Sequence, residues 1–471
     1  MAIRAGHFLD PEREQVERSI GLEVENTVQV LKGSQVSQAE LAAQFTHPAT
    51  LDRAGVAHHD RFLGSRYGSG KLYHDCGMIE FDTAEAMGPA AAAYEDMRGI
   101  ERLGAIVAAT KIPHSGIYRT AGSDVPPKRG QPSKSGVSTG CHENFLIPRV
   151  ISDDTLIDWL LPSALALRAI WAGAGALRRD GFWWSQKVVG IGGEPICRYV
   201  GRRTAHGGKP MVLIPPTEND VNTIGDDEYA RAEVRFADPS MSIVEEFLSL
   251  ADISLTLRLI ELQRVVGREI LRGLCLADPV GAAYRYARDI TLKHAELTLD
   301  GQTVTALDGQ EKFVETFELL DDQVRLPPSE KLAIAGLRSV VDSLRGSRPE
   351  KVEYTRLARA RLAAVRRHLV LSKDRKQADL KGGNAVIMAQ NLQLDRIIPL
   401  GKGLTYWRDI AAADGLAREV MRLGQEAGLT KRARHRAAII DGDGSGSTVV
   451  SWASYLDGKG KLRRLGNAYG E

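Results

Sequence analysis

Acidic side chains at every second position of the first strand-like segment narrow the possible folds of this chain more than any other feature. In SIGLEVENTVQVL, residues 19–31, Glu23 and Glu25 alternate with apolar residues. Residues i and i+2 of a strand point to the same face of a sheet, so the two carboxylates project together. The pattern predicts a half-buried strand with one acidic face.

Two further segments show the same alternation with other polar side chains. In YARAEVRF, Glu233 lies between Arg231 and Arg235, so the three side chains share one face of a strand. In CHENFLI, His142 and Asn144 share a face in the same way. Each segment alone is also typical of the solvent face of an antiparallel sheet. The combination of all three favours a site.

The run LYHDCGMIEFDTAE, residues 72–85, supplies further carboxylates as a second strand-like segment, with Asp75, Glu80, Asp82 and Glu85. Carboxylates that share a face repel one another, so they must be solvated or bridged by a cation. Such oxygen ligands suit magnesium or manganese, which also contact nucleotide phosphates, and nearby arginines would neutralise phosphate charge. Together these residues predict ATP-dependent phosphoryl transfer onto an acceptor.

Strand-like segments alternate with amphipathic helical patterns along the chain, which is typical of an α+β fold. The polar segment 121–140 contains three prolines and is predicted to be a flexible loop or lid. We expect helices at 86–111, 152–179 and 243–274, and strands at 141–147, 182–189, 210–215 and 229–236.

A change of composition late in the chain indicates a second unit. Residues 351–380 are rich in Lys and Arg on a predicted helix, which we interpret as a solvated face, with a docking surface for an acidic partner as the alternative. We therefore expect an N-terminal extension at 1–18, a catalytic domain at 19–385 and a small C-terminal domain at 386–471.

Composition argues against several classes of protein. The 62 Lys and Arg residues nearly balance 60 Asp and Glu residues, so no global charge favours nucleic acid or an acidic membrane. The four cysteines lie far apart without a CxxC pair, which argues against a disulfide scaffold or a zinc ribbon. The apolar stretch at 156–177 contains Asp158, Pro162 and Arg168, which makes it too polar to span a membrane. We expect a cytoplasmic protein with no nucleic-acid or membrane partner.

Four short motifs resemble known binding sites but lack necessary features. GSRYGSGKL resembles a phosphate-binding loop, yet Ser65 replaces its first glycine and Leu72 replaces its Ser/Thr. GIGG at 190–193 is not continued as GxGxxG, and DGDGSGS lacks the distal glutamate of a calcium loop. Trp183 and Trp184 are neighbours that face opposite ways in a strand, so core packing is a better interpretation than base stacking.

These segments together resemble the Pup ligase and depupylase (proteasome accessory factor A) family of glutamine-synthetase-like carboxylate–amine ligases. GLEVEN is similar to the family's GIETEF, LYHDCGMIEFDTAE to its LYxDxxxxPEYxTAE, and GCHENFLI to its GCHENYLI. WWSQK resembles xLSQR, and YARAEVRFADPSMS resembles YRRLHVxxGDxNMS. LDRIIPLGKGLTYW and TKRARHRAAII are similar to segments near the family's C-terminal end. The likeness spans roughly residues 20–450 in the same order.

The resemblance implies a glutamine-synthetase-like twisted antiparallel sheet that forms an open cradle, with helices behind it and a small C-terminal domain. It also implies ATP at one end of the cradle and two magnesium ions over the acidic strands. The γ-phosphate would pass to a glutamate side chain of a peptide or a small Pup-like protein, or to a small-molecule carboxylate. An amine, from a protein lysine or a small molecule, would then attack the acyl phosphate. By this resemblance Glu23, Glu25, Glu80, His142 and Glu233 are metal ligands, Asp75 and Arg235 are catalytic, and Arg231, Arg235, Asn144 and Lys187 contact the nucleotide.

The chain departs from the family pattern at positions that matter for recognition. The family histidine in RLHV is Glu233, the arginine of SQR is Lys187, and IPPTENDVNTIGDD replaces the family's NTRDEPHAD. These departures lie where nucleotide or acceptor recognition is expected. The resemblance therefore supports ATP chemistry, while binding of Pup itself is left open.

The spacing of two carboxylates favours a ligase over a hydrolase. About fifty residues separate Glu25 from Asp75, which leaves no room for the long extra loop of the depupylase branch. Cys141 also stands where that branch tends to have threonine. The alternatives are a depupylase- or deamidase-like hydrolase, an ATP-primed phosphatase, and a non-enzymatic relative that binds a nucleotide or a Pup-like protein.

Overall fold

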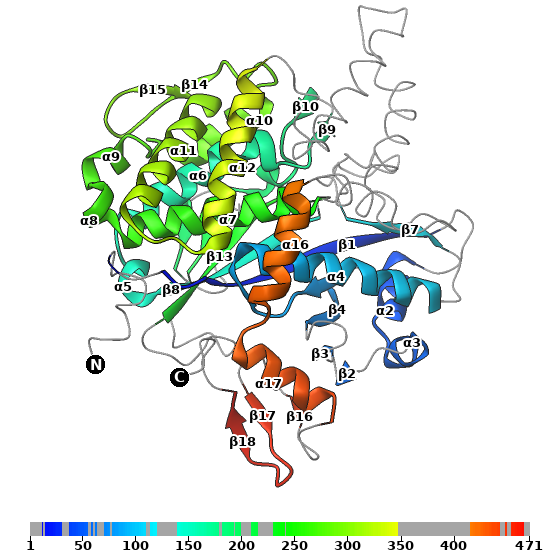
Figure 1. Cartoon of the computed structure of the whole chain (residues 1–471). Coiled ribbons are helices and arrows are strands. Elements are labelled where there is room, and N and C mark those ends of the chain that lie inside the picture. Colours follow the sequence, from blue (N-terminus) through cyan, green and yellow to red (C-terminus); the bar gives the residue numbers. More distant parts are fainter. Residues whose placement is uncertain are drawn as a thin grey trace, which may run out of the picture.

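The structure of the chain is a computed structural model, and its centre is an 11-stranded sheet (Figure 1). Strand β1 (Ser19–Val30) pairs with β8 (Cys141–Pro148) on one side and with β5 (Met78–Asp82) on the other. Strand β13 (Tyr229–Ala237) extends the sheet beyond β8. The structure describes residues 12, 15–30, 37–54, 58–59, 62–63, 70–75, 78–109, 114–119, 139–178, 181–192, 194–198, 209–214, 229–240, 242–346, 415–442, 448–449 and 454–465.

The strand order of this sheet is β11-β12-β13-β8-β1-β5-β4-β3-β2, with β6 and β7 also paired to β1. The pairs are antiparallel apart from β11 with β12, within the described residues. Long antiparallel strands acquire a right-handed twist, which curves the sheet into an open surface. The remaining strands are β2 (His58–His59), β3 (Phe62–Leu63), β4 (Lys71–Asp75), β6 (Ala86–Met87), β7 (His114–Tyr118), β11 (Ile196–Cys197) and β12 (Val212–Leu213).

Helices pack against the apolar face of the sheet, and α7 (Ile243–Glu261) lies at the centre of this layer (Figure 1). Every residue of α7 is buried, because the helix contacts α4 (Gly88–Ala109), α6 (Ile157–Ala172) and α12 (Pro328–Arg345). No helix in the described part of the chain has the length and apolar character needed to cross a bilayer. The other described α-helices before residue 346 are α2 (Gln38–Phe45), α3 (Pro48–Arg53), α5 (Arg149–Ser152), α8 (Gln263–Val266), α9 (Arg268–Arg272), α10 (Pro279–Arg288) and α11 (Ala306–Gln323).

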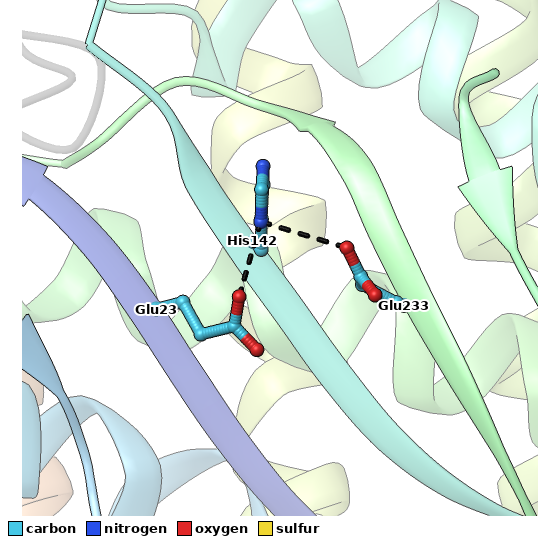
Figure 2. A group of neighbouring side chains, drawn as sticks. All are labelled: Glu23, His142 and Glu233. Atoms are coloured by element: carbon cyan, nitrogen blue, oxygen red, sulfur yellow. Dashed lines mark hydrogen bonds and ion pairs between the residues drawn. The ribbon is translucent and has the colours of Figure 1, made fainter. Parts of the chain in front are cut away.

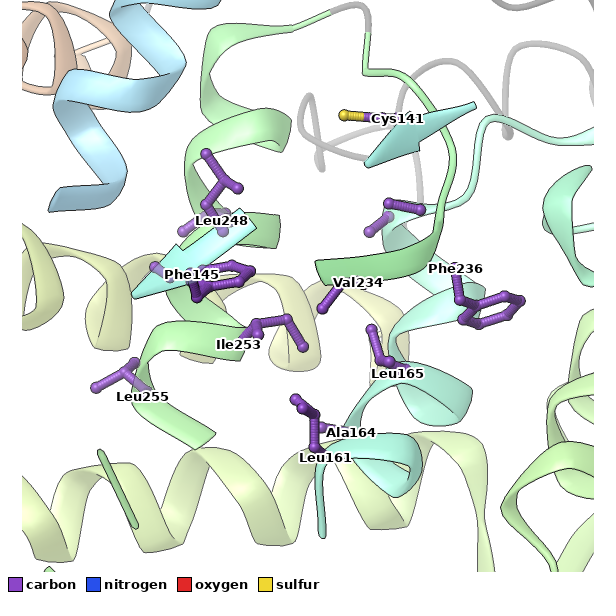
Figure 3. Packing of buried hydrophobic residues seen from close by; sticks show 14 of the residues in the cluster. Cys141, Phe145, Leu161, Ala164, Leu165, Val234, Phe236, Leu248, Ile253 and Leu255 are labelled. Atoms are coloured by element: carbon purple, nitrogen blue, oxygen red, sulfur yellow. The ribbon is translucent and has the colours of Figure 1, made fainter. Parts of the chain in front are cut away.

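Apolar side chains between the sheet and the helices form the core, and we call the side of the sheet that they cover the rear face (Figure 3). Phe145 and Val234 project from β8 and β13, Leu165 comes from α6, and Leu248 and Ile253 come from α7. Each such side chain contributes roughly 1.5–3 kcal/mol when it is fully removed from water. Since successive residues alternate between faces, the charged residues of the same strands lie on the opposite side, the front face.

The α+β class predicted from the sequence is confirmed, but the acidic run at 72–85 is not one strand. Residues 71–75 and 78–82 instead pair with each other as β4 and β5, with Asp75 opposite Met78. A connection of two residues is enough to join antiparallel strands, and side-chain alternation alone does not reveal such a reversal. Asp75 and Glu80 therefore come from different strands.

Two expected helices are also shorter than predicted. The helix expected at 152–179 is α6, which ends at Ala172 before Gly173 adopts an extended conformation. The helix expected at 243–274 ends at Glu261, and two short helices follow. Gly267 separates these two with φ +82°, a conformation that a helix does not contain.

The strand expected at 182–189 ends at Trp183, so Lys187 does not belong to a strand. It begins the short 3-10 helix η2 (Lys187–Gly190). The Asp238 carboxylate accepts the backbone N–H groups of Gln186 and Lys187 at 3.0 and 2.9 Å, and the Ser185 hydroxyl at 3.2 Å. These bonds replace strand pairing by a tight turn.

A buried charged network fixes the segment that precedes β1. Arg18 donates to the Leu146 carbonyl at 2.9 Å and to Glu261 at 2.8 Å. Arg258 donates to Glu261 at 3.0 Å and to Glu330 at 3.3 Å. The side chains of these ion pairs are fully buried. This network joins the start of β1 to α7 and α12.

The C-terminal part of the described chain, residues 415–465, contacts the layer of the sheet and its helices through two helices, α16 (Gly415–Ala427) and α17 (Lys431–Ile440). Helix α16 packs on α4, α7 and α12, and α17 contacts β3. The domain boundary expected at residue 385, the basic segment 351–380 and most of 121–140 lie outside the described residues. The division into domains therefore stays a prediction.

Candidate active site

The register of the sheet brings the acidic residues of β1 and β5 together with His142 of β8. Glu23 lies opposite His142 on one side and opposite Asp82 on the other. Glu25 lies opposite Glu80. Directly opposed residues of antiparallel strands have neighbouring side chains, so these groups share one part of the front face.

The centre of the site contains two carboxylates and one imidazole from three strands (Figure 2). The Nδ1 atom of His142 lies 3.2 Å from Oε2 of Glu23 and 3.5 Å from Oε1 of Glu233. One possible ligand atom from each residue lies within 4.8 Å of the others. Three strands that are far apart in sequence thus supply one compact group of metal-binding side chains.

Two arginines flank this central group. Arg235 Nε lies 2.7 Å from Oε1 of Glu233, and Arg231 Nη2 lies 3.3 Å from Oε2 of the same carboxylate. Asn144 accepts from Arg231 at 3.2 Å and donates to Glu23 at 3.0 Å. Both arginine side chains are 28% exposed, whereas that of Glu233 is 5% exposed. The guanidinium groups therefore hold the buried carboxylate and remain accessible to an anionic ligand.

The acidic side chains of the site differ in how readily they ionise. Burial alone would raise the pKa of Glu23, but the hydrogen bond and charge of His142, with the charge of Arg231, lower this pKa to about 2. Burial raises the pKa of Glu80 to about 7, and the charge of Glu23 adds to the rise. Burial, Glu23 and Glu80 raise the pKa of Asp82 well above its usual range. The β5 side of the site thus holds carboxylates that lack sufficient positive charge.

Lys187, which the resemblance assigns to the nucleotide, instead contacts a carboxylate. Its Nζ atom lies 3.6 Å from Oε2 of Glu25, and the lysine side chain is 8% exposed. The backbone N–H of Gly140 donates to the same Glu25 oxygen. A Cβ atom at position 140 would lie 2.0 Å from Nζ and 2.9 Å from Oε2. Only glycine leaves room for this contact.

Asp75, which the resemblance implies is catalytic, is exposed at the end of β4. The register places Tyr73 opposite Glu80 and Asp75 opposite Met78, so Asp75, Tyr73 and Glu80 share the front face. The structure thus puts Asp75 on the same side as the acidic group but at its open edge. Tyr73 makes a hydrogen bond with Glu80 and was not predicted to be part of the site.

Asp82 was also not predicted to be a site residue, although its two-residue spacing from Glu80 indicates that both side chains share one face of a strand. Glu85 of the same run is not part of the site, because it pairs with Arg432 of α17. That contact spans 347 residues and leaves no trace in a local pattern.

The central group fits a divalent cation. Carboxylate and imidazole atoms are its donors, and oxygen-rich sets of this kind suit magnesium or manganese. Nε2 of His142 is buried and has no hydrogen-bond partner among the described residues. A buried polar atom without a partner is costly in a folded protein. The site is therefore built from groups that gain from a further ligand.

The short motifs that lack necessary features of known binding sites are not part of this site, as far as the structure describes them. Trp183 and Trp184 are both buried, and Trp183 packs beneath Arg288 with 5.2 Å between guanidinium and ring. Gly190 belongs to η2, while residues 64–69 and 443–447 lie outside the described residues.

Comparison with known proteins gives one consistent result. A family model described as Pup-ligase protein matches residues 17–456. The Pup–protein ligase of Acidimicrobium ferrooxidans is 30% identical over 247 residues, which are 50% of this chain and 51% of that protein. That of Bifidobacterium longum subsp. infantis is 29% identical over 301 residues, or 63% and 58%. A depupylase of Acidothermus cellulolyticus is 26% identical over 290 residues, or 59% and 51%. The chain spans 51–58% of the length of these curated relatives.

Solved structures show the same fold. The crystal structure of the complex between the prokaryotic ubiquitin-like protein Pup and its ligase PafA has a TM-score of 0.71, at 18% identity, and covers 96% of this chain and 90% of that one. The structure of PafA in complex with ADP has a TM-score of 0.64, at 18% identity, and covers 93% and 92%. The family model covers most of the sequence, from residue 17 to residue 456, and the chain belongs to the Pup-ligase family.

Proposed function

We propose that this chain is an ATP-dependent, ADP-forming ligase that joins a glutamate side-chain carboxylate to an amine. The observation that carries the proposal is the compact group of Glu23, His142 and Glu233 with Arg231 and Arg235 beside it. Relatives named Pup–protein ligases and a solved ADP complex of the same fold support this activity.

The front-face carboxylates would hold magnesium. Glu23, His142 and Glu233 would bind one ion, and the opposed pair of Glu25 and Glu80 would bind a second. When bound, magnesium neutralises charge on the nucleotide phosphates and polarises the transferred phosphoryl group. The raised pKa of Glu80 supports this assignment, because a carboxylate short of positive charge gains most from a cation.

The arginines would bind the phosphates of ATP. Arg231 and Arg235 now contact Glu233, and their exposed edges would turn to phosphate oxygens while the metal takes over the carboxylate. Asn144, which connects Arg231 to Glu23, would keep both groups in place. Lys187 would reach a phosphate only after leaving Glu25.

The reaction would proceed in two transfers. An oxygen of the glutamate side chain attacks the γ-phosphorus of ATP, which forms an acyl phosphate and releases ADP. The amine nitrogen then attacks the acyl carbon, and phosphate leaves as the amide bond forms. Asp75 would accept the proton lost by the amine, and its exposed position supports access of a bulky acceptor.

A Pup-like protein is the proposed carboxylate donor and a lysine side chain the proposed acceptor. The names of the Pup–protein ligases and the solved complex with Pup support this pair. We also propose a cytoplasmic location, supported by the buried thiols of Cys141 and Cys275, which form no disulfide and suit a reducing compartment. The relative named depupylase favours hydrolysis as the second candidate, with water in place of the amine.

Phosphorus NMR of the protein with Mg–ATP, a peptide ending in glutamate and a lysine-containing acceptor tests the proposal. The carboxylate peptide alone should release at most about one ADP per enzyme molecule, whereas continued release of ADP and phosphate should require both substrates, and mass spectrometry should find the joined product. An Asp75→Asn variant should form the acyl phosphate but join it slowly. AMP and pyrophosphate would contradict acyl-phosphate chemistry, and cleavage of an isopeptide without net ATP use would establish the hydrolase.

A further inference from the structure

The strand that carries Glu80 and Asp82 continues into a short link that a distant segment holds in place. After β5, the link of residues 83–85 leads to β6, which pairs with the start of β1. Thr83 N donates to the Leu22 carbonyl at 2.8 Å, so this side of the link is bonded to β1. Residues 428–436, which we call the C-terminal clamp, bind its other side.

Backbone bonds attach the clamp to the link and to β6. Thr430 N donates to the Glu85 carbonyl at 3.0 Å, and Met87 N donates to the Gly428 carbonyl at 2.9 Å. Ala86 and Leu429 form an antiparallel bridge between these bonds. The clamp therefore adds a short extra strand at the place where β5 continues into β6.

A buried ion pair reinforces this attachment. Arg432 donates through Nε to Oε2 of Glu85 at 3.1 Å and through Nη2 to Oε1, which is a bidentate arrangement. Arg436 Nη1 lies 3.7 Å from Oε2 of Glu85, and Thr430 Oγ1 donates to the same carboxylate at 3.4 Å. Arg432 is 5% exposed, so water screens the pair little.

The clamp has its own anchor away from the site. The Arg436 guanidinium lies 5.7 Å from the ring centre of Phe62, which packs with Ile439 and Leu465 in a cluster separate from the main core. Thr430 caps α17 by accepting the N–H of Ala433 at 3.1 Å. The position of Glu85 is thus set by the packing of the C-terminal part.

The carboxylates of β5 need such support. Glu80 and Asp82 lie two residues apart, and each faces a further acidic residue of β1 across the strand pair. A cation binds these groups in their ionised form, in which like charges on neighbouring strands repel and push β5 away from β1. Lys71 of β4 lies opposite Asp82 and offsets only part of this repulsion. Backbone bonds and a bidentate ion pair only three residues beyond Asp82 oppose this movement.

We propose that the C-terminal clamp positions the β5 carboxylates for cation binding, and that Arg432, acting through Glu85, is a positioning residue of the site. The inference rests on the proposed function, because it takes the front-face carboxylates as metal ligands. It gives the C-terminal part a role in the chemistry that requires no contact with substrate.

Manganese binding to the nucleotide-free full chain, measured from the free-ion signal in electron paramagnetic resonance, tests the proposal without using activity. Arg432→Gln should weaken binding roughly 10-fold, the lower limit known for residues that support metal ligands. Arg432→Lys, which keeps the charge and loses the bidentate geometry, should fall between this variant and the wild type. The matched control is Arg422→Gln on α16, whose exposed pairs with Glu419 and Glu426 touch no site residue.

The outcomes separate this inference from the proposed function. Wild-type manganese affinity in Arg432→Gln, with only a lower unfolding temperature, would show a merely structural ion pair and overturn the inference. If Arg432→Gln does not fold, wild-type affinity in Arg432→Lys would overturn it equally. Absence of manganese binding and of ADP formation in the wild type would instead refute the proposed function.

Discussion

His142 and Glu143 are neighbours on β8, and their surroundings show that charged side chains are paired differently on the two faces of the sheet. On the rear face, Glu143 accepts from Arg168 at 3.1 and 3.0 Å and from Ser249 at 3.1 Å. On the front face, His142 lies between two carboxylates, and Glu80 and Asp82 of β5 form no ion pair within the described residues. The rear charge has its partner within the chain, whereas the β5 carboxylates of the front face lack one.

Arg168 links the two faces through the backbone. Its Nη1 also donates to the Ser249 carbonyl at 2.8 Å, and its Nη2 approaches the Phe236 carbonyl at 3.4 Å. Phe236 lies where the register between β13 and β8 shifts, after Val234. Arg168 therefore bonds to the irregular part of β13, next to the residue that carries the front-face guanidinium of Arg235.

Removing a front-face carboxylate should have the largest effect on function and little effect on stability. Glu233→Gln should lower ADP formation by about 100-fold, because it removes the negative charge that Glu233 contributes to the proposed metal site. Its unfolding temperature should stay within about 2 °C of the wild type. Glu419→Gln, an equal change at an exposed position, should alter neither quantity. Retained activity in Glu233→Gln would remove the distinction between the faces.

Removing the rear-face cation, Arg168, should have the opposite result, a large loss of stability. Arg168→Met leaves Glu143 buried without its ion pair, which should cost about 3–5 kcal/mol of unfolding free energy. Combining it with Glu143→Met should recover much of the loss, since two matched charges then leave together. Urea denaturation measures both.

A surface pair provides the control for this change. Arg198 pairs with Asp158 at 2.7 Å, and both side chains are about one third exposed. Arg198→Met should therefore cost under about 1 kcal/mol. If Arg168→Met and Arg198→Met lost the same unfolding free energy, burial of the Glu143 pair would not increase its contribution to stability.

Adding a single methyl group at residue 140 should have an intermediate effect on stability. Gly140→Ala would force Lys187 away from Glu25 and should cost roughly 1–3 kcal/mol of unfolding free energy. Thermal unfolding together with the KM for ATP measures the stability cost and the displaced charge. Gly190→Ala is the matched control, because a Cβ there meets nothing within 4 Å. Indistinguishable variants would contradict the tight contact at position 140.

The smallest expected effect is the pH dependence of stability that comes from Asp252, a rear-face carboxylate whose hydrogen-bond donor is an uncharged side chain. Burial raises the pKa of Asp252 to about 7, and Gln310 donates to it at 3.1 Å. The folded state then holds this proton more tightly than the unfolded state, so the wild type loses stability as pH rises from about 4 to 7. Asp252→Asn removes this contribution and should gain about 1–3 °C relative to the wild type between pH 5 and pH 8. A difference that does not vary with pH would show that Asp252 is already ionised at pH 5.

Local patterns in the sequence were sufficient to predict which residues share the front face. The two-residue spacing of Glu23 with Glu25, and of Arg231, Glu233 and Arg235, indicated one face of a strand, and the pairing registers place them there. The α+β class follows from the same alternation between strand and helix patterns. Their roles as ligands stay a prediction.

The sequence could not supply the contacts that depend on distant pairing. Whether β4 and β5 were one strand or two depends on a reversal that leaves side-chain alternation unchanged. Lys187 meets Glu25 because Asp238 folds its turn, and no spacing connects these residues. Arg168 and Glu143 are 25 residues apart on different elements, so only the tertiary structure pairs them.

The buried bond from Arg18 to Glu261 has a consequence for synthesis of the chain. Its two partners are 243 residues apart. A ribosome adds about 5–20 residues each second, so Arg18 waits roughly 12–50 s before its partner is made. Throughout that time the first strand of the sheet has emerged without the helix that neutralises its leading arginine. Nascent chains shorter than this should therefore depend on chaperones to keep β1 from pairing elsewhere.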